Sequence, residues 1–132
     1  MDAMDHERPD VYRLALDFVA MIYDLTDELP PGSSNLVNQI QRASTSIVLN
    51  IAEGAGEFSK KEKARFYRMA RRSLTESAAV LDIFRRLGLA KEEALEQARG
   101  AAVRIVAMLI RLIQRVSGEG GGMGEGTGKS RG

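Results

Sequence analysis

The chain has 132 residues, of which 44% are hydrophobic and 28% charged, enough for one globular domain with its own core. It has no cysteine, which excludes disulfide bonds and thiolate metal sites, and its single histidine, His6, lies in a polar N-terminal stretch. Its net charge is +1, and no apolar run approaches the roughly 20 residues that span a bilayer. We therefore expect a cytoplasmic protein without a membrane partner.

The first half of the chain predicts two helices. Residues 1–9 are expected to form a flexible leader, and an apolar stripe at helical spacing follows from about residue 10. The Pro-Pro-Gly sequence at 30–32 ends this first helix, because proline supplies no amide donor. Ser33 or Ser34 is the expected N-cap of the second helix.

The second half predicts two more helices. Ser59 and Glu62 form a capping box that opens the third helix, and Gly88 is suited to end it. A fourth helix is expected over 91–116, where Gly100 indicates the close approach of a neighbouring helix. The predicted core positions of the third helix are Phe66, Met69 or Ala70, Ser73, Ser77, Val80, Phe84 and Leu87.

Four long helices with short connections predict an all-α fold, an up-down-up-down antiparallel four-helix bundle over residues 10–116. The remaining residues, 117–132, are rich in glycine and are expected to form a disordered tail.

A narrow polar stripe borders the apolar stripe of the second helix, within an arc of about 80°. It consists of Gln39, Arg42, Ser46, Asn50 and Glu53. In a hairpin of the second and third helices, Arg42 comes level with Glu76, Glu53 with Arg65 and Ser46 with Arg72, and Ser73 follows Arg72 in the sequence. We therefore predict a structural polar network of these nine residues, in which Arg42 forms an ion pair with Glu76.

Several kinds of chemistry are not supported. A di-iron bundle needs Glu-x-x-His pairs on inner faces, and the only histidine lies outside the predicted bundle. The glycine turn at 54–56 lacks the pattern of a phosphate-binding loop. Glu53, Arg42 and Asn50 could form a catalytic constellation, but polar pairs at helix edges are more often structural. We expect no enzymatic activity, no cofactor and no metal.

Charge is segregated along the chain. Residues 10–28 contain five acids and one base, whereas residues 36–72 contain eight bases and three acids. These surfaces could attract each other or a neighbouring subunit, or the basic surface could bind a polyanion. The candidate RNA- or DNA-binding residues are Lys60, Lys61, Lys63, Arg68 and Arg71. With only Tyr67 available for stacking, contacts with phosphates would dominate and little sequence would be read.

Three motifs in this region point to a known family. They are Gln39-x-x-Arg42-Ala43, then Ser46-Ile47-x-x-Asn50-Ile51-Ala52-Glu53-Gly54, and finally Arg72-Ser73-x-x-Glu76. The chain resembles the small four-helix-bundle proteins first noticed as reading frames in intervening sequences of 23S ribosomal RNA genes. It departs from the family pattern at Arg72, where glycine is usual.

This resemblance implies a bundle that assembles into a ring-shaped homopentamer. It also implies kinship with the accessory proteins of diversity-generating retroelements, basic pentamers that bind nucleic acid and a reverse transcriptase. No enzymatic activity is associated with the family. Two functions remain open: an oligomer that binds nucleic acid through its basic helix, and a protein-interaction scaffold that binds none.

Overall fold

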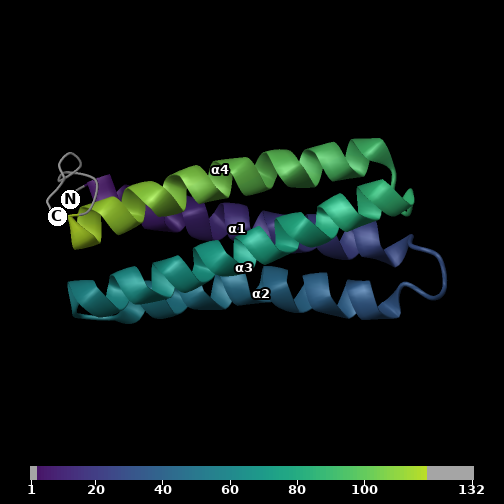
Figure 1. Cartoon of the computed structure of the whole chain (residues 1–132). Coiled ribbons are helices and arrows are strands. Elements are labelled where there is room, and N and C mark those ends of the chain that lie inside the picture. The colour runs from purple at the N-terminus through teal and green to yellow at the C-terminus, as the bar shows by residue number, and fades with distance from the viewer. Residues whose placement is uncertain (1–2, 119–132) are drawn as a thin grey trace, which may run out of the picture.

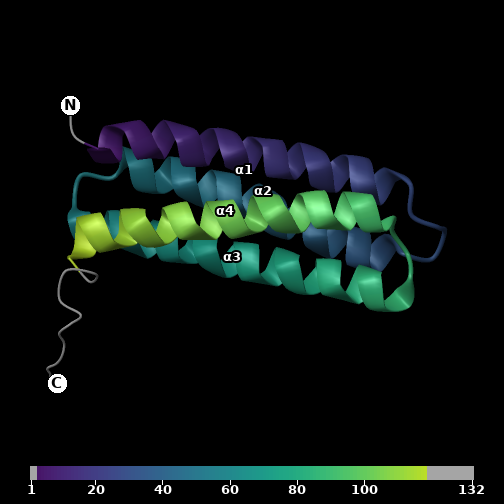
Figure 2. The same cartoon turned by 90° about the horizontal axis from the view of Figure 1, so that it is seen from above.

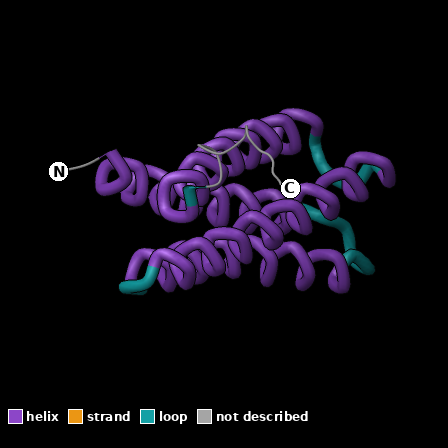
Figure 3. The backbone as a smooth tube through the Cα atoms, turned by 60° about the vertical axis from the view of Figure 1, so that its left-hand side comes forward, coloured by secondary structure: helices purple, strands orange, loops and turns teal. Residues whose placement is uncertain are grey.

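The computed structural model describes residues 3–118, with side chains from Asp10 onward. Four helices follow one another: α1 (Ala3–Asp27), α2 (Ser34–Gly56), α3 (Lys60–Leu87) and α4 (Glu92–Ser117). Short loops join the ends of successive helices, and this part of the chain contains no strand (Figure 3).

The helices lie along a common direction, with α2 beside α3 and α1 beside α4 (Figures 1 and 2). Around the bundle, α1 also packs on α2 and α3 also packs on α4, so each helix has two neighbours. This arrangement confirms the predicted all-α, up-down-up-down antiparallel bundle. None of the described helices is long and apolar enough to cross a membrane.

The ends of the bundle differ from the predicted boundaries. Helix α1 begins at Ala3, so residues 3–9 are helical and do not form the expected leader. Their alanine, methionine, glutamate and arginine are strong helix formers, which favours this extension despite a proline at position 9. At the other end, Gly118 terminates α4 with a φ of 76°. Residues 1–2 and the predicted tail from residue 119 lie outside the described residues.

One apolar stripe from each helix forms a shared core. The largest side chains without exposed surface include Phe18, Ile22, Ile40, Ile47, Tyr67, Phe84, Ile105, Leu109 and Leu112. Burying such a side chain stabilises the fold by about 1.5–3 kcal/mol. This burial holds the bundle together and positions the polar surfaces described below.

Three expectations about packing are wrong. In the first half of α3, Tyr67 and Leu74 are buried, whereas Phe66 and Ser73 are only half-buried. The predicted stripe is therefore off by one position at Phe66 and Ser73 only, since Ala70, Ser77, Val80 and Phe84 are buried as predicted. Leu87, also expected in the core, is 60% exposed. Gly100 is exposed, and a methyl group added there would have no neighbouring atom within 4 Å, so it does not mark a close helix contact.

The turn between α3 and α4 has the predicted glycine. Gly88 has a left-handed φ of 66°, and the amide of Leu89 donates to the carbonyl of Phe84 at 3.0 Å. Arg85 bridges the two helices, with its Nη2 atom 2.8 Å from a carboxylate oxygen of Glu92. The hydrogen bond to Glu92 raises the pKa of the Arg85 guanidinium.

The two serines at helix starts should respond differently to substitution by alanine. Ser59 accepts a hydrogen bond from the amide of Glu62 at 2.9 Å, whereas Ser33 makes no side-chain capping bond. We expect Ser59→Ala to lower the free energy of unfolding by about 1 kcal/mol, and Ser33→Ala to have a clearly smaller effect. Urea unfolding of both variants measures the difference, and equal effects would contradict the assignment of the cap.

Candidate nucleic-acid interface

The hairpin of α2 and α3 is joined by small hydroxyl groups. The hydroxyl of Ser73 donates to the hydroxyl of Ser46 at 2.9 Å. The side-chain amide of Asn50 donates to the same Ser46 oxygen at 3.0 Å and to the Ser46 carbonyl at 2.9 Å. Ser46 was expected beside residue 72, so the predicted register differs by one residue. Three of the nine predicted network residues are therefore directly connected.

In the part of the chain that the structure describes, the charged residues of the predicted network, unlike Ser46 and Ser73, are not joined across the two helices. Arg42 and Glu76 are both exposed, and no ion pair joins them among the residues that the structure describes, so the predicted pair is wrong. Long side chains at a wet helix edge gain little from pairing, because water solvates each charge. Four further members, Gln39, Glu53, Arg65 and Arg72, are also exposed.

A double-mutant cycle should separate the two kinds of contact. We expect Ser46→Ala and Ser73→Ala to be coupled by about 0.5–1.5 kcal/mol, because each removes the same half-buried hydrogen bond. A cycle of Arg42→Ala and Glu76→Ala serves as the control and should show no coupling beyond experimental error. Chemical unfolding measures the coupling energy in both cycles. A larger coupling energy for Arg42 and Glu76 than for Ser46 and Ser73 would support the predicted ion pair.

The C-terminal turn of α2 fits closely against α3. Gly54 is buried, and a Cβ atom added to it would lie 2.6 Å from the ring of Tyr67. The ammonium group of Lys63 lies 3.4 Å from the carbonyl oxygen of Gly54 and 3.3 Å from that of Ala55. Lys63 therefore binds carbonyl groups at the end of α2, as a cation does near a helix C-terminus. This contact makes Lys63 less available for binding a phosphate.

The solvent-facing side of α3 carries a basic stripe, defined here as Lys61, Arg65, Arg68 and Arg72. Their spacing of four, three and four residues places them on one face over a length of about 16 Å. Arg65 donates to Glu62 at 3.0 Å, and its guanidinium lies 4.4 Å above the ring of Phe66. Lys61, Arg65 and Arg72 are exposed, and Arg68 is half-buried.

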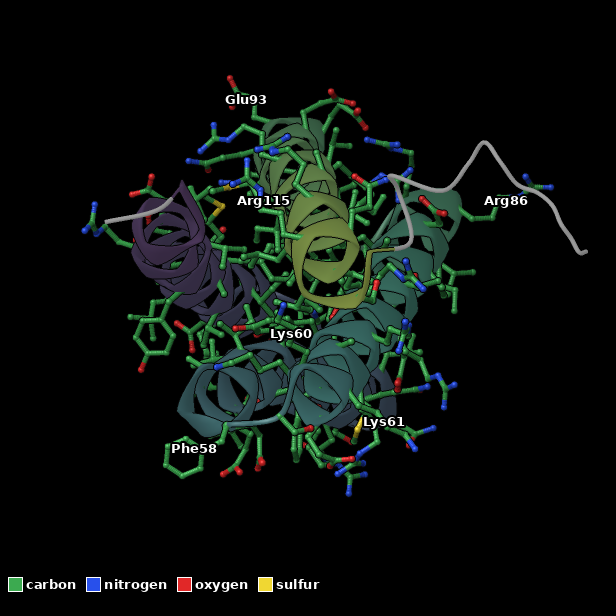
Figure 4. All side chains as sticks on the ribbon, turned by 90° about the vertical axis from the view of Figure 1, so that its left-hand side faces the viewer. Phe58, Lys60, Lys61, Arg86, Glu93 and Arg115 are labelled. Carbon is green, nitrogen blue, oxygen red and sulfur yellow. The ribbon has the colours of Figure 1, made fainter. Side chains whose placement is uncertain are left out.

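The surroundings of the stripe are strongly positive. Between positions 60 and 72 the sequence has seven basic residues and one acid, Glu62. Lys60 projects over the end of the bundle, while Lys61 projects outward from α3 (Figure 4). Arg71 is half-buried. Arg72, which the hairpin register had assigned to the internal network, therefore belongs to the outer surface.

Sequence reasoning missed one aromatic residue at this surface. Phe58, in the turn between α2 and α3, is 100% exposed and projects away from the bundle (Figure 4). Tyr67, the aromatic residue considered for stacking, is instead fully buried in the core. The position of Phe58 between a helix end and a capping serine was the available signal, because such a turn rarely buries its side chains.

The remaining polar groups do not assemble a metal centre. No group of three or more histidine, cysteine, aspartate or glutamate side chains suited to an ion occurs between residues 10 and 118.

Comparison with known proteins agrees with this architecture. The profile of the family described as 23S rRNA-intervening sequence protein matches residues 7–111. The chain belongs to this family. A crystal structure of a protein of unknown function from the S23 ribosomal protein family of Bacteroides thetaiotaomicron is similar, with a TM-score of 0.76 and 24% identity. The match covers 82% of this chain and 98% of that one, and it shows the shared fold. Comparison with curated proteins finds no match.

In this member of the 23S rRNA-intervening sequence family, the central motif has a structural role. Ser46 accepts the hydrogen bond from Ser73 of α3, and Asn50 donates to the same Ser46 oxygen from within α2. Ile47 and Ile51 enter the core, and Gly54 makes room for Tyr67. The motif thus fixes the hairpin that presents the basic stripe.

Proposed function

We propose that this protein is a non-enzymatic, ring-like homopentamer that binds RNA or DNA through α3. The observation that carries the binding proposal is the basic stripe, three of whose four residues are exposed on one helix, with a single acid in the thirteen residues from 60 to 72. A rigid, positively charged face without a deep pocket suits a phosphate backbone. Its side chains can neutralise phosphates and release condensed counterions, which drives binding without reading sequence.

Two features raise the affinity that such a surface can reach. Phe58 supplies an exposed ring close in sequence to Lys60 and Lys61, where an unpaired base could stack on it for about 1–3 kcal/mol. A ring of subunits would also present several basic stripes to one strand. Each further contact would then be intramolecular, so weak individual contacts would add to a useful avidity.

An apolar patch supports self-assembly. It consists of exposed Tyr12, Leu16 and Tyr23 on α1 and of Leu49 on α2, which is 61% exposed. Tyr23 lines a small hollow with Gln41 and Thr45 of α2, so the two helices share this face. Exposed apolar groups gathered on one face are typical of protein interfaces. The number of five subunits rests on the family resemblance.

The binding proposal is tested by removing charge from the basic surface. We expect Lys60→Gln, Lys61→Gln and Arg72→Gln together to lower the affinity for single-stranded RNA and duplex DNA alike. The slope of log affinity against log salt should fall by about one for each phosphate that the variant no longer neutralises. Fluorescence anisotropy with labelled probes, each about 20 nucleotides long to span more than one stripe, measures both quantities.

A matched control removes three exposed charges elsewhere, through Arg13→Gln, Arg86→Gln and Arg104→Gln. This variant has the same net charge as the Lys60, Lys61 and Arg72 variant but keeps the basic surface of α3. It should therefore retain most of the affinity for nucleic acid. Equal losses in the two variants would show a general charge effect, and absence of binding at low salt would refute the proposal. The alternative, a protein-interaction scaffold without nucleic-acid binding, would then be favoured by the apolar patch.

A further inference from the structure

A groove between α1 and α4 combines an apolar floor with an acidic rim. It lies where α3 turns into α4 and has a volume of about 810 Å³. Its floor includes Met21, Leu29, Leu89 and Ala94, which are half-buried against the core. This groove is at the opposite end of the bundle from the turn that carries Phe58 (Figure 1). It is therefore separate from the basic stripe.

The rim of the groove is strongly negative. Asp17 and Asp24 lie on α1 and Glu28 directly follows it, while Glu93 lines the groove from α4 and projects outward from the bundle in Figure 4. Lys91 is the only base among the lining residues, and its ammonium lies 3.5 Å from the carboxylate of Glu28. The other three carboxylates have no cationic partner among the described residues.

The end of α1 adds to this negative potential. Its last turn contains Asp24 and Asp27 and no basic residue. A helix C-terminus carries a partial negative charge, so carboxylates there are unfavourable and cations are favourable. Local rules of this kind are most often broken at functional sites, where a ligand compensates the conflict.

We propose that this groove binds a basic amphipathic helix of a partner protein. Apolar side chains of that helix would rest on Met21 and Leu29, and its lysines or arginines would pair with Asp17, Asp24 and Glu93. Asp17 and Asp24 are two turns apart, about 10.5 Å, which matches basic residues spaced by seven in the partner. Nucleic acid is unsuited to the groove because its phosphates would meet carboxylates.

A second copy of this chain fits the groove less well than a basic amphipathic helix does. Its most basic helix, α3, already buries its apolar stripe in its own bundle, so it could offer charge but not an amphipathic face. The proposal does not depend on the binding of nucleic acid.

The test uses a labelled helical peptide of lysine and leucine, about 16 residues long, with lysines spaced by seven. We expect it to bind the full-length protein in anisotropy titrations at moderate salt. Asp17→Asn, Asp24→Asn and Glu93→Gln together should weaken binding about tenfold or more, since they remove the charges that pair with the peptide. Glu53→Gln, Glu57→Gln and Glu76→Gln together make the same change of net charge on the α2–α3 hairpin and should have little effect.

A second pair of variants tests whether the peptide occupies the groove itself. Ala20→Arg places a long cation at the exposed edge of the groove and should weaken binding, whereas Ala79→Arg on α3 should not. Circular dichroism confirms that each variant is folded. Equal effects of the matched variants, or equally tight binding of a lysine and serine peptide, would overturn the proposal. Self-association abolished only in the acidic-rim variant would instead assign the groove to a second copy.

Discussion

Replacing Gly54 by alanine should destabilise the protein by about 2 kcal/mol. The added methyl group would lie 2.6 Å from Cε1 and 2.9 Å from Cδ1 of Tyr67, and this ring is fully buried. Such overpacking costs about 3 kcal/mol at the upper end of its usual range, because a buried ring has no space to move. The better helix propensity of alanine offsets about 1 kcal/mol of this cost. Thermal and urea unfolding measure the net loss.

Two comparisons make this result specific. Gly56→Ala, two residues further along the same helix, adds a methyl group with no neighbouring atom within 4 Å and should be neutral or slightly stabilising. In a Tyr67→Leu background, which removes the clashing ring, Gly54→Ala should lose most of its cost or reverse its sign. A cost that persists without the ring would show that Gly54 is needed for a reason other than space.

Substituting Leu16→Glu and Leu49→Glu together should convert the proposed homopentamer into monomers. Both side chains are exposed in the single chain, at 44% and 61%, so the charges should not disturb its fold. In a subunit interface, the same carboxylates would be desolvated without partners, at a cost of several kcal/mol for each charge. The apparent mass from light scattering should therefore fall to that of one chain, while helicity stays unchanged.

The matched control is Val103→Glu, which places one charge on an exposed apolar residue of α4. It should leave the mass unchanged if α1 and α2 form the interface. Dissociation by Val103→Glu alone would move the interface to α4. A monomer in the unmodified protein at micromolar concentration would remove the oligomer from the proposal altogether.

The architecture was accessible from the sequence because its signals are local. Helix lengths follow from apolar spacing, and the ends of α3 follow from Ser59 and Gly88, whose capping roles depend only on nearby atoms. The register of the hairpin was predicted to within one residue, because a turn of three residues leaves little freedom for the two helices.

The partners of polar side chains were harder to predict. A one-residue difference in register brings Ser73 to Ser46 in place of Arg72, and it turns the arginine outward. Arg42 and Glu76 are level in sequence, yet each is solvated, since Coulomb attraction at an exposed edge is too weak to select one geometry. Register alone therefore did not predict which polar groups are bonded.

The burial of Tyr67 in place of Phe66 has a similar origin. The two aromatic residues are adjacent, so either could lie near the apolar face of α3. The choice depends on space in the opposing helix, which Gly54 provides for the ring of Tyr67. Single-helix periodicity contains no information about that space.

The order in which the helices pack also affects how the molecule forms. Every pair of helices that is consecutive in sequence is in contact, and only the packing of α1 on α4 joins distant parts of the described chain. Folding dominated by such short-range contacts is fast, on the order of microseconds to milliseconds. The α2–α3 hairpin has the shortest connection, so we expect it to form first and to bring the basic stripe into place before the bundle closes. The groove between α1 and α4 exists only once the bundle has closed.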